Sequence, residues 1–361
     1  MSKDLAARCA RLLCVGFSGH EASPELVELV RRGVRKVILF ARNVSDPEQV
    51  LSLTRAIKSL STERIAVAVD QEGGPVRRLR KGFTELPAMR TVGRSDDVHV
   101  AERTGALLGR ELRAVGIDWN FAPVLDVDTN PNNPVIGQRA FSHLPEKVAE
   151  LGLALARGLS TQGVAACGKH FPGHGDTELD SHLDLPRISH SLERLERVEL
   201  VPFAAAVAAG IPSIMSAHVV FSAVDPDFPA TLSPAVLGGL LRQRLGYDGL
   251  VVSDDLEMNA IVEHYGIVTA MVRGLAAGVD CFLVCHTPER MHAAIDATLR
   301  AVEENRLSPA LIDRALVRHD IFDARWVKPA PLRLEPGLLR NDEHLALASA
   351  LALHSQAAQE G

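Results

Sequence analysis

The stretch EKVAELGLALARGLSTQGVAACGKHF, residues 146–171, has the pattern of one helix followed by one strand, with polar side chains near the end of the strand. Apolar residues recur at helical spacing over 146–163, and a short apolar run follows over 164–171. That run ends in Lys169 and His170, two side chains that are costly to bury without a partner. We therefore predict a helix followed by a strand whose carboxyl end carries functional groups.

The same alternation of helix and strand recurs along the chain. Apolar strand candidates lie at 12–17, 36–40, 65–70, 118–127, 164–171, 211–220, 249–255 and 280–285. Amphipathic stretches lie between them, as at 47–60, 146–163 and 233–245. Eight such units in roughly 300 residues are typical of a (β/α)₈ TIM barrel of the α/β class, whose usual size is about 250 residues plus insertions. A doubly wound open sheet is the alternative, and the number of units favours the barrel.

The pattern changes near residue 328. KPAPLRLEPG is Pro-rich and loop-like, and HLALASALALHSQAAQEG then predicts an Ala/Leu-rich helix. We expect a single catalytic domain over 1–328, followed over 329–361 by the Pro-rich segment and a C-terminal helix that docks on the barrel or frays.

Composition excludes several classes of protein. Apolar residues make up 47% of the 361 positions, enough for a large core, and the net charge of −6 has both signs interspersed, unlike a nucleic-acid-binding protein. A membrane span needs a run of about 18 apolar residues, and the sequence has none. The N-terminus lacks the layout of a signal peptide. The five cysteines lie mostly in apolar runs, which predicts reduced, buried thiols in a cytoplasmic protein.

Polar side chains gather where the predicted strands stop. They are Asp70, Lys169, His170, His218, Asp254 and Asp255. Active sites of (β/α)₈ barrels collect at the carboxyl ends of the strands. The sequence therefore predicts an active site at this end of the barrel.

The stretch KHFPGHGDTELDSH, residues 169–182, allows two kinds of chemistry. His170 and His174 have the spacing of a helical metal site, but the Pro and Gly between them break a helix, and further ligands are scarce. We therefore expect no metal.

The other possibility is acid–base catalysis. Asp180 and His182 are two residues apart, and a carboxylate that binds one imidazole nitrogen leaves the other free for a substrate. Spacing alone does not separate this role from that of an exposed loop with solvated charges. Asp176 and Glu178 are interpreted as such solvated charges.

This stretch and three other motifs resemble the family 3 glycoside hydrolases, most closely the bacterial β-N-acetylglucosaminidases of peptidoglycan recycling. The other motifs are DQEGGPVRRL (70–79), NFAPVLDVDTNPNNPVIGQRAF (120–141) and VVSDDLEM (251–258). The four occur in the family's order, and the resemblance covers residues 10–325, which implies the same barrel.

The resemblance assigns the catalytic roles. It implies that Asp254 is the nucleophile of a retaining mechanism and that His182, paired with Asp180, is the acid/base. Asp255 is the competing candidate for the nucleophile, although alternation along a strand should turn it to the opposite side.

Sugar binding follows from the same resemblance. It implies contacts from five residues, Asp70, Arg78, Arg139, Lys169 and His170. Asp126 is expected to support the site from behind without touching the sugar. Pro75 departs from the family's usual pattern and is expected to alter the loop before Arg78.

The function implied is hydrolysis of terminal β-linked N-acetylglucosamine, with retention, from muropeptides in which this sugar is attached to anhydro-N-acetylmuramic acid. No cofactor, nucleic acid or membrane is expected, and the chain should be a monomer. A phosphorylase, a sugar-binding barrel without catalysis and a metal-dependent hydrolase are the alternatives. The C-terminal helix resembles the helix that opens a second domain in larger family members, a domain expected to be absent here.

Overall fold

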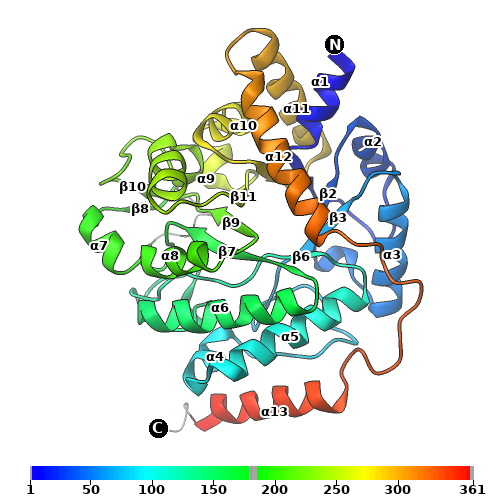
Figure 1. The fold of residues 1–361 in the computed structure, drawn as a ribbon, viewed down its shortest axis with the longest axis vertical. Coiled ribbons are helices and arrows are strands. Elements are labelled where there is room, and N and C mark those ends of the chain that lie inside the picture. Colours follow the sequence, from blue (N-terminus) through cyan, green and yellow to red (C-terminus); the bar gives the residue numbers. More distant parts are fainter. Residues whose placement is uncertain (1, 179, 181–184, 358–361) are drawn as a thin grey trace.

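A closed barrel of eight parallel strands forms the centre of the protein (Figure 1). The computed structural model describes residues 2–178, 180 and 185–357. Around the barrel the strand order is β1-β12-β11-β9-β7-β6-β3-β2. Their bounds are Leu13–Val15 (β1), Lys36–Leu39 (β2), Ala66–Val69 (β3), Trp119–Asn120 (β6), Ala165–Phe171 (β7), Ser213–Ser216 (β9), Leu250–Asp255 (β11) and Cys281–Val284 (β12). Each of the predicted strands supplies one of them, so the predicted barrel is confirmed.

Helices surround the barrel on its outside (Figure 1). In the first half of the chain they are Ser2–Ala10 (α1), Pro24–Arg32 (α2), Pro47–Ser59 (α3), Met89–Ser95 (α4), Val98–Ala114 (α5) and Pro145–Thr161 (α6). In the second half they are Leu192–Arg197 (α7), Leu200–Ala208 (α8), the π-helix Ala235–Arg244 (η4), Asn259–Val262 (α9), Gly266–Ala277 (α10), Pro288–Glu303 (α11), Pro309–Trp326 (α12) and Asp342–Ala357 (α13). Short 3₁₀ turns cover Ala41–Asn43 (η1), Gly137–Arg139 (η2) and Ala230–Leu232 (η3).

Two small sheets lie outside the barrel, and the sequence did not predict them. An antiparallel hairpin joins Gln71–Gly73 (β4) to Val76–Arg77 (β5), directly after β3. A parallel pair joins Arg187–Ile188 (β8) to Val220–Phe221 (β10). Both sheets follow barrel strands at their carboxyl ends, so they shape the loops of that face.

The strand predicted over 118–127 is much shorter in the structure. Beyond Asn120 the chain still runs beside β7, because Ala122 and Pro123 accept hydrogen bonds from the N–H groups of Cys167 and Lys169 at 2.8 and 3.1 Å. Pro123 has no N–H to give in return, so the regular ladder stops there.

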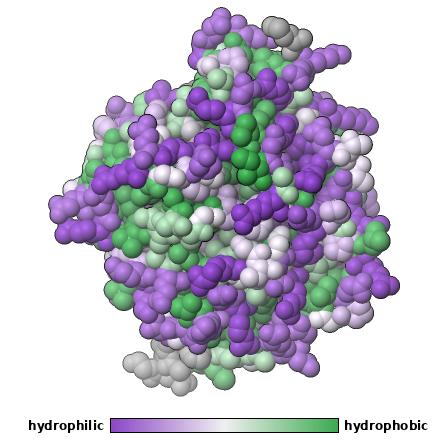
Figure 2. All heavy atoms as spheres, in the orientation of Figure 1, coloured by the Kyte–Doolittle hydropathy of each residue, from purple (hydrophilic) through white to green (hydrophobic). Residues whose placement is uncertain are grey.

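The interior of the barrel is a packed core. Trp119 is fully buried, packs edge-on against Phe121 with ring centroids 4.6 Å apart, and donates its indole N–H to Ser213 Oγ at 2.8 Å. All five cysteines are buried free thiols, as the sequence predicts. The face shown in Figure 2 is mostly hydrophilic with scattered apolar patches, which agrees with a core that lies inside. Within the described part of the chain, no helix combines the length and apolarity that crossing a membrane requires.

The predicted C-terminal helix is present as α13, and it docks beside α4 and α5 (Figure 1). Leu347 and Leu351 are buried in this contact. The buried carboxylate of Glu111, in α5, accepts hydrogen bonds from His344 Nδ1 at 3.0 Å and from the Arg340 N–H at 2.9 Å. It also accepts from the N–H and hydroxyl of Thr84 at 2.9 and 2.6 Å. One side chain thus fastens the C-terminal segment to the loop that follows the β4–β5 hairpin.

We predict that Glu111→Ala lowers the free energy of unfolding by about 2–4 kcal/mol, because four donors lose their acceptor and several are buried. Burial raises the pKa of Glu111, but the four hydrogen bonds outweigh it and lower that pKa. The contribution is therefore complete above the ordinary carboxylate range and is lost as the pH falls through the lowered value. Urea denaturation at neutral pH measures the loss.

Glu343→Ala is the matched control, because this carboxylate lies on α13, next to His344, but is 61% exposed and 3.6 Å from Arg110. It should change stability by less than about 0.5 kcal/mol. Equal losses in the free energy of unfolding for the two variants would show that the hydrogen bonds of Glu111 do not stabilise the contact with the C-terminal segment.

Candidate active site

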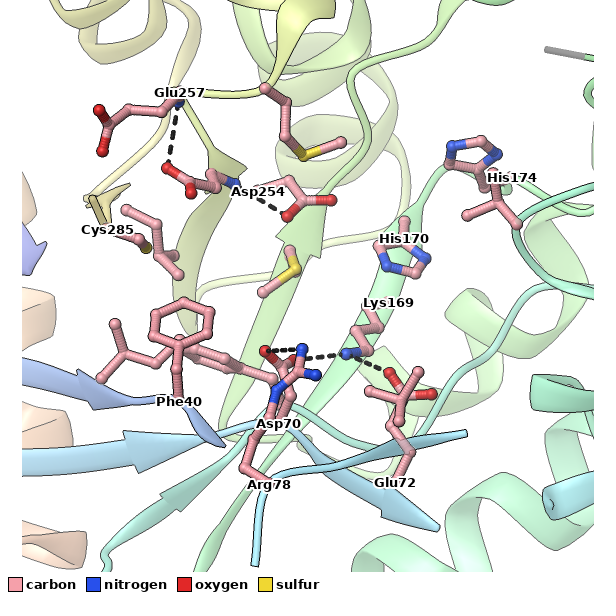
Figure 3. Close-up of a pocket in the computed structure, with 18 of the residues that line it drawn as sticks. Phe40, Asp70, Glu72, Arg78, Lys169, His170, His174, Asp254, Glu257 and Cys285 are labelled. Carbon is pink, nitrogen blue, oxygen red and sulfur yellow. Dashed lines mark hydrogen bonds and ion pairs between the residues drawn. The ribbon is translucent and has the colours of Figure 1, made fainter. Parts of the chain in front are cut away.

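A cavity of about 400 Å³ opens at the carboxyl ends of the strands (Figure 3). Residues from β2, β7, β9, β11 and β12 and from the loops at the carboxyl ends of the barrel strands line it. Among its polar lining residues are Asp70, Glu72, Arg78, Arg139, Lys169, His170, His174, Asp254, Asp255, Glu257 and His286. The structure thus brings together all five predicted sugar contacts and the predicted nucleophile.

Lys169 forms the centre of the polar floor. Its Nζ lies 2.9 Å from Asp70 Oδ1 and 2.6 Å from Glu72 Oε1, and its side chain is 2% exposed. Burial lowers the pKa of Lys169, but the two carboxylates outweigh burial and raise it. The ammonium group therefore stays charged.

Glu72 also holds Arg139 in place. The guanidinium donates from Nε to Oε2 at 2.9 Å and from Nη2 to Oε1 at 2.8 Å, a bidentate pair that fixes its plane. Burial raises the pKa of Glu72, but Arg139 and Lys169 lower it far below its usual range. One buried carboxylate thus binds two cations, Lys169 from strand β7 and Arg139 from the loop after β6.

His170 is oriented from behind by Asp126. The fully buried carboxylate accepts from His170 Nδ1 at 2.7 Å and from the N–H groups of His170 and His174 at 3.1 and 2.7 Å. With Nδ1 bound to Asp126, the other ring nitrogen is left for the cavity. Asp126 is absent from the cavity lining, in line with the supporting position expected for it.

Gln71 holds the backbone around Arg78. Its side-chain oxygen accepts from the N–H groups of Arg78 and Leu79 at 2.8 and 3.0 Å, and its amide donates to the Leu79 carbonyl at 2.9 Å. The Arg78 side chain has weaker contacts of its own, with Nη2 3.5 Å from Asp70 Oδ2 and Nε unpartnered among the described residues. The backbone of the hairpin, rather than the guanidinium, therefore sets where Arg78 lies.

Asp254 points into the cavity on the side of His170 (Figure 3). Its Oδ1 accepts from the Asp255 N–H at 2.8 Å. Burial raises the pKa of Asp254, but His170, His218 and this N–H lower it to about 2. The carboxylate is therefore ionised at neutral pH, as a nucleophile must be.

The expectation that Asp255 turns away from the site is wrong. Strand β11 continues through Asp255, yet its pairing with β12 shifts register between Val252 and Asp255, and both carboxylates line the cavity. Asp255 is engaged elsewhere, because it accepts from the Glu257 N–H at 3.1 Å and lies 3.1 Å from His286 Nε2. Hydrogen bonding, rather than strand alternation, distinguishes the two aspartates.

The predicted acid/base pair is only partly described. Asp180 is half-buried, and His182 lies outside the described residues. The interpretation of Asp176 as a solvated charge is wrong, because it is half-buried, is hydrogen-bonded to His190 Nε2 and accepts from Thr129 Oγ1 at 2.9 Å. Glu178 is exposed, as expected.

The two histidines with metal-like spacing both line the cavity. His170 and His174 stand edge to face with ring centroids 5.8 Å apart, and His170 Nδ1 is bound to Asp126. Burial lowers the pKa of His174 to about 4, which leaves that imidazole neutral at neutral pH. No cluster of three or more potential metal-ligating side chains occurs among the residues that the structure describes.

Comparison with known proteins agrees with this geometry. Residues 5–319 match the model of the glycosyl hydrolase family 3 N-terminal domain. The chain is 46% identical over 259 residues to a curated β-hexosaminidase of Thiobacillus denitrificans, covering 70% of this chain and 72% of that protein.

Solved structures give the same result. A family 3 β-N-acetylglucosaminidase from Paenibacillus sp. FPU-7 is 43% identical with a TM-score of 0.95, over 97% of this chain and 68% of that one. NagZ from Neisseria gonorrhoeae, solved with N-trifluoroacetyl-D-glucosamine, is 34% identical with a TM-score of 0.80, over 95% and 98%.

The chain belongs to glycoside hydrolase family 3. It is a glycoside hydrolase of the β-hexosaminidase type, similar to bacterial β-N-acetylglucosaminidases.

Sequence analysis of this family 3 hydrolase missed Glu72 and Gln71. A signal for Glu72 was present, because Lys169 and Arg139 were both expected in the site and buried cations need carboxylates. Glu72 lies in the same quoted motif as Asp70, two positions further on. Gln71 had no such signal, since its hydrogen bonds depend on a hairpin that the sequence did not predict.

We predict that Gln71→Ala raises the KM for an aryl N-acetylglucosaminide about 10-fold or more and leaves kcat within a few-fold. The reason is that Arg78 loses its fixed position, which removes binding shared by the ground state and the transition state. Steady-state kinetics of the aryl substrate measure both constants.

The comparison variant is Arg78→Ala, whose defect should be of similar size. Combining the two substitutions should add little, because residues that act through one contact are not additive. If the double variant instead shows the full product of the single effects, Gln71 does not act through Arg78.

Proposed function

We propose that the enzyme is a retaining β-N-acetylglucosaminidase that works by double displacement, with Asp254 as the nucleophile. The observation that carries the proposal is the position of Asp254 at the end of β11, ionised and pointing into the cavity, while Asp255 is bound to His286 and Glu257. Asp254 would attack the anomeric carbon as the bond to the leaving oxygen breaks, and form a glycosyl-enzyme.

His182, supported by Asp180, is the proposed acid/base. It would protonate the departing oxygen and then remove a proton from the water that attacks the glycosyl-enzyme. The protein then returns to its starting protonation state. The support for this role is the family motif and the course of the described chain, which leaves β7 at the cavity wall and reaches the half-buried Asp180.

Five polar side chains of the cavity are proposed to bind the sugar. Asp70, Arg78, Arg139, Lys169 and His170 line the same cavity as Asp254. Paired carboxylates and cations offer fixed acceptors and donors to ring hydroxyls. They orient the anomeric carbon toward Asp254.

The proposed substrate is a muropeptide with a terminal N-acetylglucosamine on anhydro-N-acetylmuramic acid, cleaved by a monomer in the cytoplasm. The similarity to bacterial β-N-acetylglucosaminidases supports this choice, and five reduced cysteines fit a reducing compartment.

We predict that a slow fluorinated N-acetylglucosaminyl inhibitor adds one sugar mass to the peptide that contains VVSDDLEM. Fragmentation should place the label on Asp254, because Asp254 points into the cavity toward His170 while Asp255 is held by His286 and Glu257. Mass spectrometry of the digested enzyme is the measurement.

Two outcomes would contradict this prediction in different ways. A label on Asp255 keeps the double displacement and overturns the residue. Strong inhibition by an oxazoline-mimicking thiazoline, with no label at all, would mean that the acetamido group of the substrate attacks instead.

Phosphorolysis is the second candidate, because a histidine acid/base repels an incoming phosphate less than a carboxylate would. We predict that inorganic phosphate neither accelerates turnover of an aryl N-acetylglucosaminide nor yields a sugar 1-phosphate. Product analysis by NMR spectroscopy, with and without phosphate, distinguishes the two reactions. Quantitative formation of the sugar phosphate would make the enzyme a phosphorylase.

A further inference from the structure

A side-chain hydrogen bond joins the two ends of the stretch that carries Asp180 and His182. Asp176 follows β7, His190 follows β8, and His190 Nε2 contacts Asp176 Oδ2. The side chain of Asp176 is 22% exposed and that of His190 is 31% exposed, so both are partly shielded from water.

The Asp176 end is anchored independently of His190. Thr129 Oγ1 donates to Asp176 Oδ1 at 2.9 Å, and Asn133 Nδ2 donates to the His174 carbonyl at 2.9 Å. Gly175 lies so close to the Val127 carbonyl that a Cβ atom there would be 1.8 Å away. The chain that enters the stretch is therefore pressed against the loop after β6.

The His190 end is anchored as well. Strand β8 pairs with β10, the Val220 N–H donates to the Pro186 carbonyl at 2.9 Å, and the Ser222 N–H donates to the Ile188 carbonyl at 3.0 Å. The backbone on both sides thus has its own support. The Asp176–His190 pair is not needed to build either anchor, and its effect is to fix one anchor relative to the other.

A second carboxylate lies near the pair. Glu199 is 2% exposed, and burial raises its pKa, while Arg194 and the charge of His190 act in the opposite direction. Arg194 Nη2 lies 3.2 Å from Glu199 Oε1. Arg194 therefore offsets part of the charge of Glu199 at this end of the stretch.

We propose that Asp176 and His190 are positioning residues for the acid/base step. By joining the two anchors they fix the distance between the two ends of the segment that carries Asp180 and His182. An error of about 1 Å in the position of a catalytic group can cost roughly 10²-fold in rate. This inference rests on the proposed role of His182.

The test compares leaving groups. For Asp176→Ala and His190→Ala we expect kcat/KM to fall about 10- to 100-fold with a β-linked N-acetylglucosamine disaccharide, whose departing oxygen needs a proton. With a dinitrophenyl N-acetylglucosaminide, which leaves without protonation, kcat/KM should fall less than about 3-fold. The double variant should be no worse than either single variant.

Azide supplies a second measurement. With the dinitrophenyl substrate, breakdown of the glycosyl-enzyme becomes limiting, and that step needs a base to activate water. Azide attacks without a base, so it should restore kcat in both variants and release the glycosyl azide. A defect of folding would not respond to azide, which separates positioning from a purely structural role.

Glu178→Ala is the matched control, because it removes an exposed carboxylate from the same stretch. It should leave kcat/KM unchanged with both substrates. His190→Gln, which can still donate to Asp176, should recover part of the loss. Equal losses on both substrates, or no rescue by azide, would overturn the proposal.

His182→Ala separates failure of this inference from failure of the proposed function. If His182→Ala shows the leaving-group dependence and the Asp176 and His190 variants do not, the positioning role is wrong and the acid/base role stands. If His182→Ala itself lacks that dependence, the acid/base assignment falls, and the positioning role falls with it. In the His182→Ala background, adding His190→Ala should cost nothing further.

Discussion

The site depends on a buried ammonium group. Lys169 ends a strand whose neighbours leave its side chain 2% exposed, and an unpaired charge in that position would be very costly. Asp70 supplies one counter-charge at the end of β3. Glu72 supplies the second, which requires the chain to turn back at once, and the β4–β5 hairpin is that turn. Because Glu72 also binds Arg139, the charge balance of one lysine joins β7 to the loops that follow β3 and β6.

The two aspartates at the end of β11 show how hydrogen bonding selects between chemically equal groups. Both carboxylates line the cavity, so position alone does not distinguish them. Asp255 accepts from a backbone N–H and contacts His286, which engages both of its oxygens. Asp254 accepts one N–H on Oδ1, and no described residue donates to its second oxygen. That oxygen is the one able to attack a substrate without first losing a partner.

The sequence predicts the barrel well because the signal is local. Apolar runs and helical spacing repeat along the chain, and the ends of those runs place Asp70, Lys169 and Asp254 on one face. Contacts between residues that are far apart in the sequence produce no repeating pattern in it, so they are not predicted in this way. The role of Asp176 depends on His190 and Thr129, which approach only after three loops have packed together. For this reason its local context, a run of polar loop residues, led to the wrong interpretation.

Several loops near the cavity are held by buried side-chain oxygens that accept hydrogen bonds from their backbone N–H groups. Gln71, Glu111 and Asp126 each accept hydrogen bonds from backbone N–H groups of loops that reach the site or support it. Each lies outside the cavity lining and is almost fully buried, so water does not compete for these bonds. A loop held through its backbone does not need its pocket-facing side chain for support. Arg78 and the second oxygen of Asp254 consequently keep most of their binding capacity for a substrate, which is the condition that pre-organised catalysis requires.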